Sequence, residues 1–454
     1  MRLRLGVSLF VLLCASAHAG PADWKRQVDA VAQPLLAAGW CKSIVVGLVD
    51  GKDQQVFCYG STGGTTPTTP NADTLYEIGS VSKTFTSLAL ASMAGEGMVA
   101  LDDPLKKYLP STVALPVTSP AIRLTDLATH TAGLPRMPPG VPTDSWISPA
   151  AGMTSSQLFA KLDHVALLYP TAGTTYTYSN FGAAVLGQAL AVRARRSYEQ
   201  LISERLLHPL GMLDTVVALK PAVIARAAHG AADDMSDLPL WADTAMAPAG
   251  WIKSTMNDML RYLHAQLEPP DNPLGRAIQA THVPRVHAAA DLGVALAWHV
   301  RPSRHLTFHN GATGGARSLV AFRDDRAAGV VMLATGTTYA VDAAEGQLLD
   351  VLDGKDPAPL ALPAEAALAP GALDGLVGRY RFDPNLEIVI AQPGARLTAQ
   401  ITGAPPATLF AQAPDRFHLR IQDQSVTFTR DAGGHVTGLV LHVGDDELPA
   451  SREP

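Results

Sequence analysis

The chain has 454 residues, of which 47% are hydrophobic and 17% charged, and its formal net charge is −6. This length exceeds one ordinary domain, and the composition is that of a globular protein with large cores. The sequence carries no basic stripe of the kind that nucleic-acid-binding proteins use, so nucleic acid is not an expected partner.

Residues 1–19 have the pattern of a secretory signal. Two arginines precede an apolar run from Leu5 to Cys14, and Ala17-His18-Ala19 offers a small-residue cleavage site. We therefore expect cleavage after Ala19 and a periplasmic or secreted mature protein. A lipid anchor on Cys14 is the alternative, although Leu13 is bulky where a small residue is expected. No later stretch reaches the ~18 consecutive apolar residues of a transmembrane helix, so no membrane span is expected in the mature chain.

The first part of the mature chain predicts a helix and then a hairpin. Apolar residues recur at helical spacing over residues 22–38, and strands Ser43–Val49 and Gln54–Tyr59 flank an Asp50-Gly51 turn. Cys41 and Cys58 form an even pair, which favours a disulfide in an exported protein. With this turn, Cys41 falls one diagonal step from Cys58 and must bend in from beyond the strand.

The pattern over residues 20–355 predicts one α/β (α+β) catalytic domain. Strands and a helix are expected at both ends of this region, with helices between them, so we predict an antiparallel sheet flanked by helices and an inserted all-helical subdomain. A cleft would lie between the two. The later elements expected are helices at 181–190, 197–207 and from 254 onwards, strands at 305–309, 317–322 and 329–334, and a helix at 341–352.

The pattern changes after residue 355. Residues 356–372 are rich in Pro and Ala and predict a linker. Residues 373–454 predict a small antiparallel β domain, either a sheet or a barrel, that is dispensable for chemistry. Its expected strands are Leu386–Ile390, Arg396–Thr402, Ala407–Gln412, Arg416–Ile421, Ser425–Thr429 and His435–His442.

The first candidate for chemistry is the pair Ser80 and Lys83, at the start of an apolar helical run that Gly95 and Gly97 end. A serine hydroxyl is a weak nucleophile and needs a neighbouring base. A lysine three residues on lies on the same helix face, and burial lets it lose its proton more readily. Taken alone, the pair also fits a capping serine followed by a solvated lysine.

Two further motifs contain polar residues that suit acyl transfer. In Tyr178-Ser179-Asn180, a tyrosine near a lysine can pass a proton and an asparagine can bind a substrate amide. The alternative is a purely structural role, with a buried tyrosine and a helix-capping asparagine. In His309-Asn310-Gly311-Ala312, at a strand end, a backbone N–H could join that of Ser80 in an oxyanion hole, and Gly311 permits close approach. The alternative is a surface histidine at a hairpin.

Taken in this order, the three motifs resemble the active-site set of the penicillin-recognising serine hydrolases, and most of all the class C β-lactamases and D-alanyl-D-alanine carboxypeptidases. The similar stretches extend well beyond the motifs and cover roughly residues 25–353. They include residues 77–86, 127–135, 252–255 with 258–259, 311–315, 320–322 and 329–334.

The resemblance implies a role for each candidate residue. Ser80 would form an acyl-enzyme, while Lys83 and Tyr178 move its proton and later activate water. Asn180 would bind the substrate amide, and the N–H groups of Ser80 and Ala312 would form the oxyanion hole. The resemblance implies no cofactor and no metal, and a β-lactam or a peptidoglycan peptide as substrate.

The third motif departs from the class C pattern. Its first residue is usually lysine, whose fixed charge lies near the substrate carboxylate, but here it is His309 followed by Asn310. An ordinary histidine titrates near pH 6.5 and supplies this charge only when protonated. His309, Asn310 and Gly311 are still expected to bind substrate.

Three functions remain open. A β-lactamase or D,D-peptidase ranks first and an esterase of the same family second. The sequence does not settle the substrate, because pocket loops such as Pro135–Pro149 decide it. The third is a penicillin-binding sensor that is acylated but does not turn over. A zinc hydrolase fails, since His305 and His309 would lie ~13 Å apart on a strand. The sequence leaves the oligomeric state open.

Overall fold

The computed structural model describes residues 21–117, 121–142, 147–163, 165–242 and 244–453. The predicted signal, its cleavage site and Cys14 lie outside these ranges. No helix in the described part of the chain combines the length and apolar character needed to cross a membrane.

An antiparallel sheet forms the centre of the larger unit, in the strand order β2-β1-β12-β11-β10-β9-β8-β7. Strand β1 comes from near the N-terminus but pairs with β12, from Ser43 opposite Thr335 to Asp50 opposite Ala328. The predicted sheet built from both ends of the region is therefore confirmed. Its strands are β1 Ser43–Asp50, β2 Asp53–Gly60, β7 Val286–Ala289, β8 Leu292–Val294, β9 His299–Arg301, β10 Leu306–Ala312, β11 Ala316–Arg323 and β12 Ala328–Thr335.

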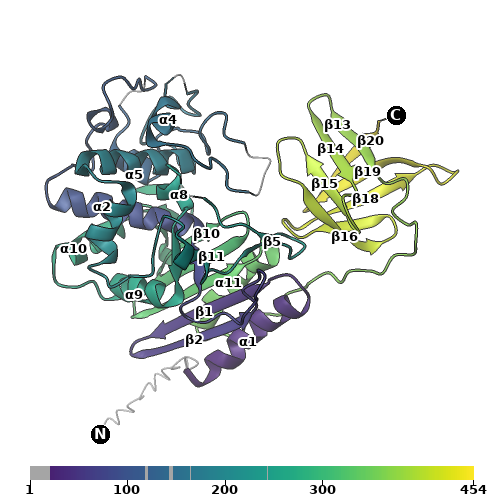
Figure 1. The fold of residues 1–454 in the computed structure, drawn as a ribbon, viewed down its shortest axis with the longest axis horizontal. Coiled ribbons are helices and arrows are strands. Elements are labelled where there is room, and N and C mark those ends of the chain that lie inside the picture. The colour runs from purple at the N-terminus through teal and green to yellow at the C-terminus, as the bar shows by residue number, and fades with distance from the viewer. Residues whose placement is uncertain (1–20, 118–120, 143–146, 164, 243, 454) are drawn as a thin grey trace, which may run out of the picture.

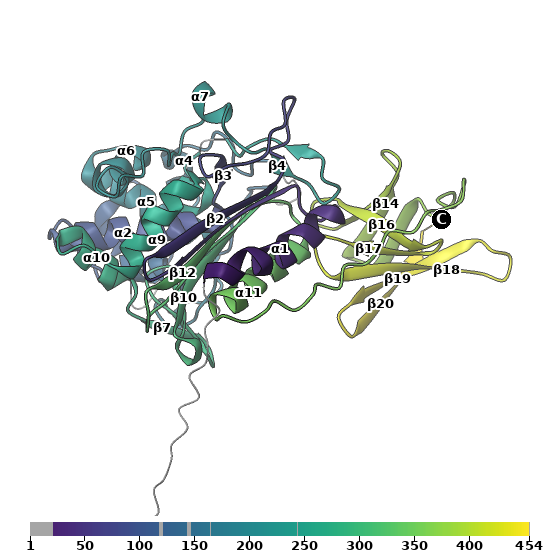
Figure 2. The same cartoon turned by 90° about the horizontal axis from the view of Figure 1, so that it is seen from below.

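Helices cover both faces of this sheet, because its central strands are apolar on both sides. In β1, Ile44 and Val46 pack toward helices α1 (Pro21–Ala37) and α11 (Tyr339–Leu352), while Val45 faces the opposite, helical layer. Figure 2 shows α1 and α11 lying together along one face.

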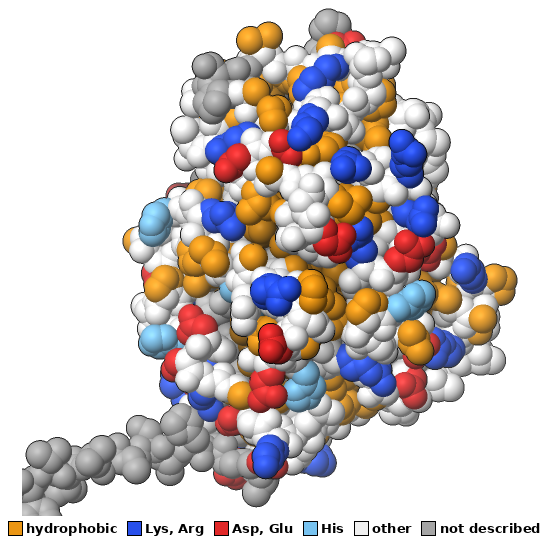
Figure 3. Space-filling model, turned by 90° about the vertical axis from the view of Figure 1, so that its left-hand side faces the viewer, with side chains coloured by type: hydrophobic (Ala, Val, Ile, Leu, Met, Phe, Trp, Pro, Cys, Tyr) orange, Lys and Arg blue, Asp and Glu red, His pale blue; other side chains and the backbone are white. Residues whose placement is uncertain are grey.

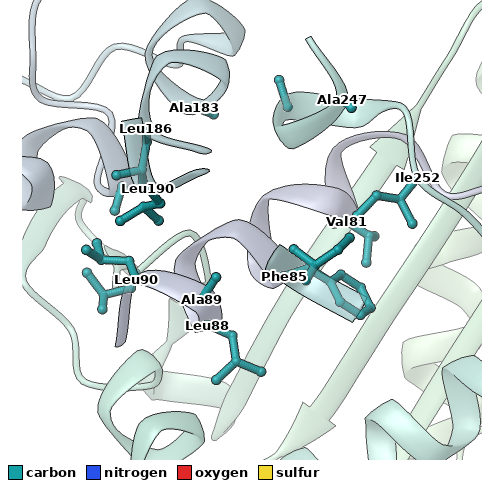
Figure 4. Close-up of a cluster of buried hydrophobic side chains, with 14 of the residues drawn as sticks. Val81, Phe85, Leu88, Ala89, Leu90, Ala183, Leu186, Leu190, Ala247 and Ile252 are labelled. Atoms are coloured by element: carbon teal, nitrogen blue, oxygen red, sulfur yellow. The ribbon is translucent and has the colours of Figure 1, made fainter. Parts of the chain in front are cut away.

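The helical layer is organised around helix α2 (Ser82–Gly95), which is apolar on nearly all sides and therefore buried. Leu90 of α2 packs near Leu186 and Leu190 of α5 (Asn180–Ala194) (Figure 4). Phe85 stacks on Tyr262 of α9 (Met256–Leu267), with ring centroids 4.2 Å apart. This packing fixes the start of α2, where the candidate serine lies.

The side shown in Figure 3 mixes acidic and basic side chains and has no continuous basic stripe on that face.

The remaining helices of the layer are shorter than α2 and α5. The helices are α3 Leu124–Ala128, α4 Ser155–Ala160, α6 Tyr198–Ile202, the π-helical continuation Ser203–Leu207, α7 Pro221–Ile224, α8 Ala247–Gly250, α9 Met256–Leu267 and α10 Pro273–Thr281. Single 3-10 turns span Gly79–Val81, Leu105–Tyr108 and Pro302–Arg304, and the short strands are β3 Leu75–Glu77, β4 Gly230–Ala231, β5 Asp237–Leu238 and β6 Lys253–Thr255.

Beyond α11, residues 356–372 contain no helix or strand, and a closed antiparallel barrel follows (Figure 1). The predicted small β unit is thus a barrel, whereas the exact domain boundaries stay a prediction. Its strands are β13 Gly378–Asp383, β14 Leu386–Ala391, β15 Leu397–Ile401, β16 Ala407–Ala413, β17 Arg416–Leu419, β18 Gln424–Arg430, β19 Val436–Val443 and β20 Asp446–Arg452.

The sequence pattern missed the first and last barrel strands. β20 is charged, contains Pro449 and exposes most of its side chains, so it has little apolar alternation. Its pairing with β19 and β13 closes the barrel and supplies the stabilisation that its own composition lacks.

The predicted disulfide between Cys41 and Cys58 is wrong. The hairpin turns at Gly51-Lys52 instead of Asp50-Gly51, which places Cys58 opposite Val45. Cys41 lies four residues before Val45, or ~13 Å along a strand, which is too far for a disulfide. Both thiols are free, and Cys41 Sγ donates to the carbonyl oxygen of Ser43 at 3.1 Å.

The two thiols should differ in reactivity. Burial raises the pKa of Cys41 to about 12, and half-burial raises that of Cys58 in the same direction. In the native protein we expect a maleimide to label Cys58 slowly and Cys41 more slowly still. Peptide mapping by mass spectrometry measures both, and both should label fully in unreduced, unfolded protein. A Cys41–Cys58 peptide pair resistant to labelling until reduction would contradict this result.

Candidate active site

Ser80 lies in the 3-10 turn Gly79–Val81, directly before α2, where it meets the end of β10. Gly79 has φ +48°, and a Cβ there would lie 2.5 Å from the nitrogen of Ala312. A Cβ on Gly311 would lie 2.1 Å from the carbonyl oxygen of Ile78. Two glycines therefore permit the turn at Ser80 and strand β10 to touch backbone to backbone.

Lys83 lies under Ser80, one helical turn further on. Its Nζ donates to Ser80 Oγ at 2.9 Å and to the carbonyl oxygen of Ala249. The side chain is 1% exposed. Burial, with a smaller contribution from the positive charge of Arg136, holds the pKa of Lys83 well below its usual value near 10.5. A lysine in this environment can carry or accept the serine proton.

Tyr178 completes the group around the hydroxyl. Its ring centroid lies 4.8 Å from Lys83 Nζ, and its phenol hydrogen-bonds with the side chain of Ser80. Burial raises the pKa of Tyr178 above its usual value near 10, although the Ser80 hydrogen bond opposes the shift. Tyr178 is therefore a neutral phenol at neutral pH in this state, and a phenolate is disfavoured.

Asn180 is the first residue of α5 and is not its cap. Ser179 caps the helix, since its Oγ accepts the N–H of Gly182 at 2.9 Å and donates to the carbonyl of Pro135. Asn180 is thereby left to line the pocket beside Ser80. Among the described residues its Oδ1 is buried without a hydrogen-bond partner, which suits an atom that accepts from substrate.

His309 reaches the same interior but not as the sequence analysis assumed. It is 1% exposed, and its ring stacks on His299 with centroids 5.1 Å apart. Burial first, then His299 and Lys83, hold the pKa of His309 well below 6.5. The expectation of ordinary titration near pH 6.5 is therefore wrong, and His309 is neutral at neutral pH.

Asn310 points to the opposite face of β10, because side chains alternate along a strand. Its Nδ2 donates to Glu345 of α11 at 3.0 Å, and Asn310 is not among the residues that line the pocket beside Ser80. Burial, followed by the nearby Asp342, raises the pKa of Glu345 to about 8. Asn310 thus anchors β10 to α11, on the opposite face of the strand from the pocket beside Ser80.

The pocket beside Ser80 has a volume of about 260 Å³ and a largely apolar wall. Sequence reasoning missed its cationic residue, Arg136, whose guanidinium lies 5.2 Å from the Tyr178 ring centroid. Arg136 falls in the loop that was expected to rim the site, but nothing in one sequence distinguishes it from other exposed arginines. The other lining residues include Met137, Pro142, Pro149, Trp241, Trp251, Thr313 and Pro405.

Two further residues position this group. His130 has an unusual φ of +59° and accepts the N–H of Ser179 at Nδ1 at 3.2 Å, with its ring 4.5 Å from that of Tyr178. Glu77 accepts from Thr313 Oγ1 at 2.7 Å and from the N–H of Trp241. Both lie in or near stretches that carried the family resemblance, yet neither was assigned a role.

A family model described as Beta-lactamase matches residues 28–354. The chain belongs to the β-lactamase family. It is accordingly a serine hydrolase, as the resemblance implied. Among curated relatives, a β-lactamase of Lysobacter lactamgenus is 30% identical over 63% of this chain and 70% of its own. The D-alanyl-D-alanine-carboxypeptidase/endopeptidase AmpH of Escherichia coli (strain K12) is 31% identical over 53% of this chain and 61% of its own.

Solved structures of the family share the fold of the larger unit. A class C β-lactamase matches with a TM-score of 0.64 at 23% identity, over 73% of this chain and 95% of its own. The D-alanine carboxypeptidase AmpC of Burkholderia cenocepacia matches with a TM-score of 0.62 at 26% identity, over 73% and 99%.

The contact between Gly79 and Ala312 can be tested in this β-lactamase-family enzyme. We expect Gly79→Ala to slow acylation of Ser80 by p-nitrophenyl acetate at least ~10²-fold. The new methyl group would push the backbone N–H groups of Ser80 and Ala312 apart. Gly97→Ala is the matched control, since Gly97 also has positive φ (+70°) but nothing lies within 4 Å of its Cβ position. Equal acylation rates in the two folded variants would contradict the proposed importance of this contact.

Proposed function

We propose that this protein is an exported serine hydrolase that works through an acyl-enzyme on Ser80, acting on β-lactams or D-Ala-D-Ala peptides. The observation that carries the proposal is the 2.9 Å contact between the buried Lys83 Nζ and Ser80 Oγ at a pocket. The names of the two curated relatives agree with this substrate class. The pattern of residues 1–19 supports export.

The chemical step follows from the positions of three side chains. Ser80 Oγ forms a bond to the substrate carbonyl carbon while its proton passes to neutral Lys83. The proton then reaches the departing nitrogen, with the neutral Tyr178 phenol as relay, and the carbon–nitrogen bond breaks. Water repeats these transfers to release the acid and restore Ser80.

The oxyanion of the intermediate would be held by the N–H groups of Ser80 and Ala312. The backbone contact between Gly79 and Ala312 supports this role, because it fixes the two groups relative to each other. Asn180, with its unpartnered buried Oδ1, would accept from the substrate amide.

The substrate carboxylate would meet Arg136. His309 is buried and neutral, so the charge that lysine usually supplies at the third motif is missing there. Arg136 lines the pocket and is permanently charged, and a guanidinium matches a carboxylate in shape and charge. An esterase acting on neutral acyl esters remains the second candidate, favoured by the same loss of fixed charge at His309.

Acylation by penicillin tests the proposal directly. Intact-mass analysis should show one adduct that maps to Ser80 and is absent in Ser80→Ala. Lys83→Ala should fold and slow acylation at least ~10²-fold, the usual scale for a lost proton acceptor. An adduct that persists in Ser80→Ala would refute the proposal. An adduct that never hydrolyses, together with no turnover of a D-Ala-D-Ala peptide, would identify a penicillin-binding sensor.

The pH profile of this acylation distinguishes the two candidate bases. A base must be deprotonated, so the rate should rise with pH up to the pKa of the base and then level off. Lys83, with its lowered pKa, gives an inflection well below 10.5, whereas a Tyr178 phenolate would give one above 10.

The role of Arg136 predicts a split between charged and neutral substrates. We expect Arg136→Gln to lower kcat/KM for penicillin at least about tenfold, since hydrogen bonds to charged groups contribute ~1.5–3 kcal/mol. Turnover of p-nitrophenyl acetate should fall less, because Arg136 affects it only through its smaller contribution to the pKa of Lys83. Arg276→Gln, at an exposed position on α10, is the control. An equal loss on both substrates would assign Arg136 a structural role.

A further inference from the structure

The barrel reaches the catalytic pocket. Pro405, in the loop between β15 and β16, lines the same pocket as Ser80, Asn180 and Ala312. The sequence analysis treated residues 373–454 as dispensable, but this position makes the barrel part of the wall beside the nucleophile.

A buried carboxylate fixes this loop. Asp233 Oδ2 accepts the N–H of Thr408 at 2.6 Å, and its Oδ1 accepts the Thr408 hydroxyl at 2.8 Å. Thr408 comes three residues after Pro405. Just before Asp233, Ala231 of β4 donates its N–H to the carbonyl of Gly315 at 2.9 Å, in the turn that follows β10. Loop and pocket rim are thus joined through the Asp233 side chain and one backbone hydrogen bond.

A second attachment holds the same end of the barrel. Arg420 donates to the carbonyl of Gly39 at 2.6 Å and lies over the Trp40 ring, 4.7 Å from its centroid. His418 stacks on Trp40 with ring centroids 5.5 Å apart and an interplanar angle of 10°. Arg420, His418 and Trp40 are all buried at this attachment.

The attached end of the barrel is hollow. A second pocket of about 140 Å³ lies there, and Pro405 is part of its wall as well. This volume is close to that of apolar cavities, ~150 Å³, that accept a benzene-sized group. Its apolar lining includes Ile401, Ala404, Leu419 and Ile421.

We propose that the two pockets form one substrate site, in which the barrel binds an aliphatic or aromatic group of the acyl chain attached to Ser80. Pro405 lies where the acyl chain passes from one pocket to the other. The proposal rests on the acyl-enzyme chemistry proposed above. It adds the class of acyl group that the enzyme prefers, namely an extended apolar chain instead of a short one.

The experiment measures kcat/KM of the full-length enzyme for p-nitrophenyl esters from acetate to octanoate. Burial of each added methylene should raise kcat/KM about fourfold until the barrel pocket is full. Ala404→Trp, which fills the pocket, and Ile401→Ser, which makes its wall polar, should flatten this rise and leave acetate turnover unchanged. Ala432→Trp, at an exposed position in the β18–β19 loop, is the matched control and should keep the rise.

The outcomes separate the two proposals. Turnover of acetate that is lost in Ser80→Ala supports the acyl-enzyme whatever the longer esters do. A flat chain-length profile, or a rise that both variants keep, overturns the barrel site alone. No Ser80-dependent turnover with any ester or with penicillin overturns the chemistry and the barrel site together. If Ala404→Trp fails to fold, Ile401→Ser decides.

Discussion

The active site depends on one steric constraint, the backbone contact between the turn at Ser80 and the end of β10. Gly79 and Gly311 are the residues that permit it, since a methyl group at either would meet backbone atoms at 2.5 Å or less. Ser318 Oγ adds a hydrogen bond to the carbonyl of Ile78 at 2.8 Å. The contact joins the helical layer to the sheet, so the candidate site is lined by residues of both.

Burial then sets the chemistry at this contact. Lys83 and His309 are buried and Tyr178 is partly buried, and desolvation favours the neutral form of each. A neutral lysine can accept a proton and a neutral phenol can relay one. The permanent charge lies instead on Arg136, at the exposed side of the pocket. The site therefore has neutral titratable groups in its interior and a positive charge at its rim.

The fold of the larger unit could be predicted because its strands and helices have strong periodicity and turn residues. The motifs at Ser80 and Tyr178 also identified residues that lie together in the structure, beside Lys83. Three features could not be predicted from the sequence. The hairpin register depended on a two-residue turn, and a shift of its position by one moved Cys58 two residues along β1. The side of β10 that Asn310 faces, and the burial of His309, depend on packing with α11 and His299. The proximity of Pro405 to Ser80 arises from contacts between units far apart in the chain.

The pairing of β1 with β12 has a consequence for folding. The hydroxyls of Ser43 and Thr335, which hydrogen-bond at 2.8 Å, are separated by 292 residues in sequence. Until β12 has paired with β1, the β1–β2 hairpin has an open apolar edge. Closing so large a loop makes the assembly of the sheet a late and slow step. The β1–β2 hairpin therefore stays open to aggregation until β12 has paired with it.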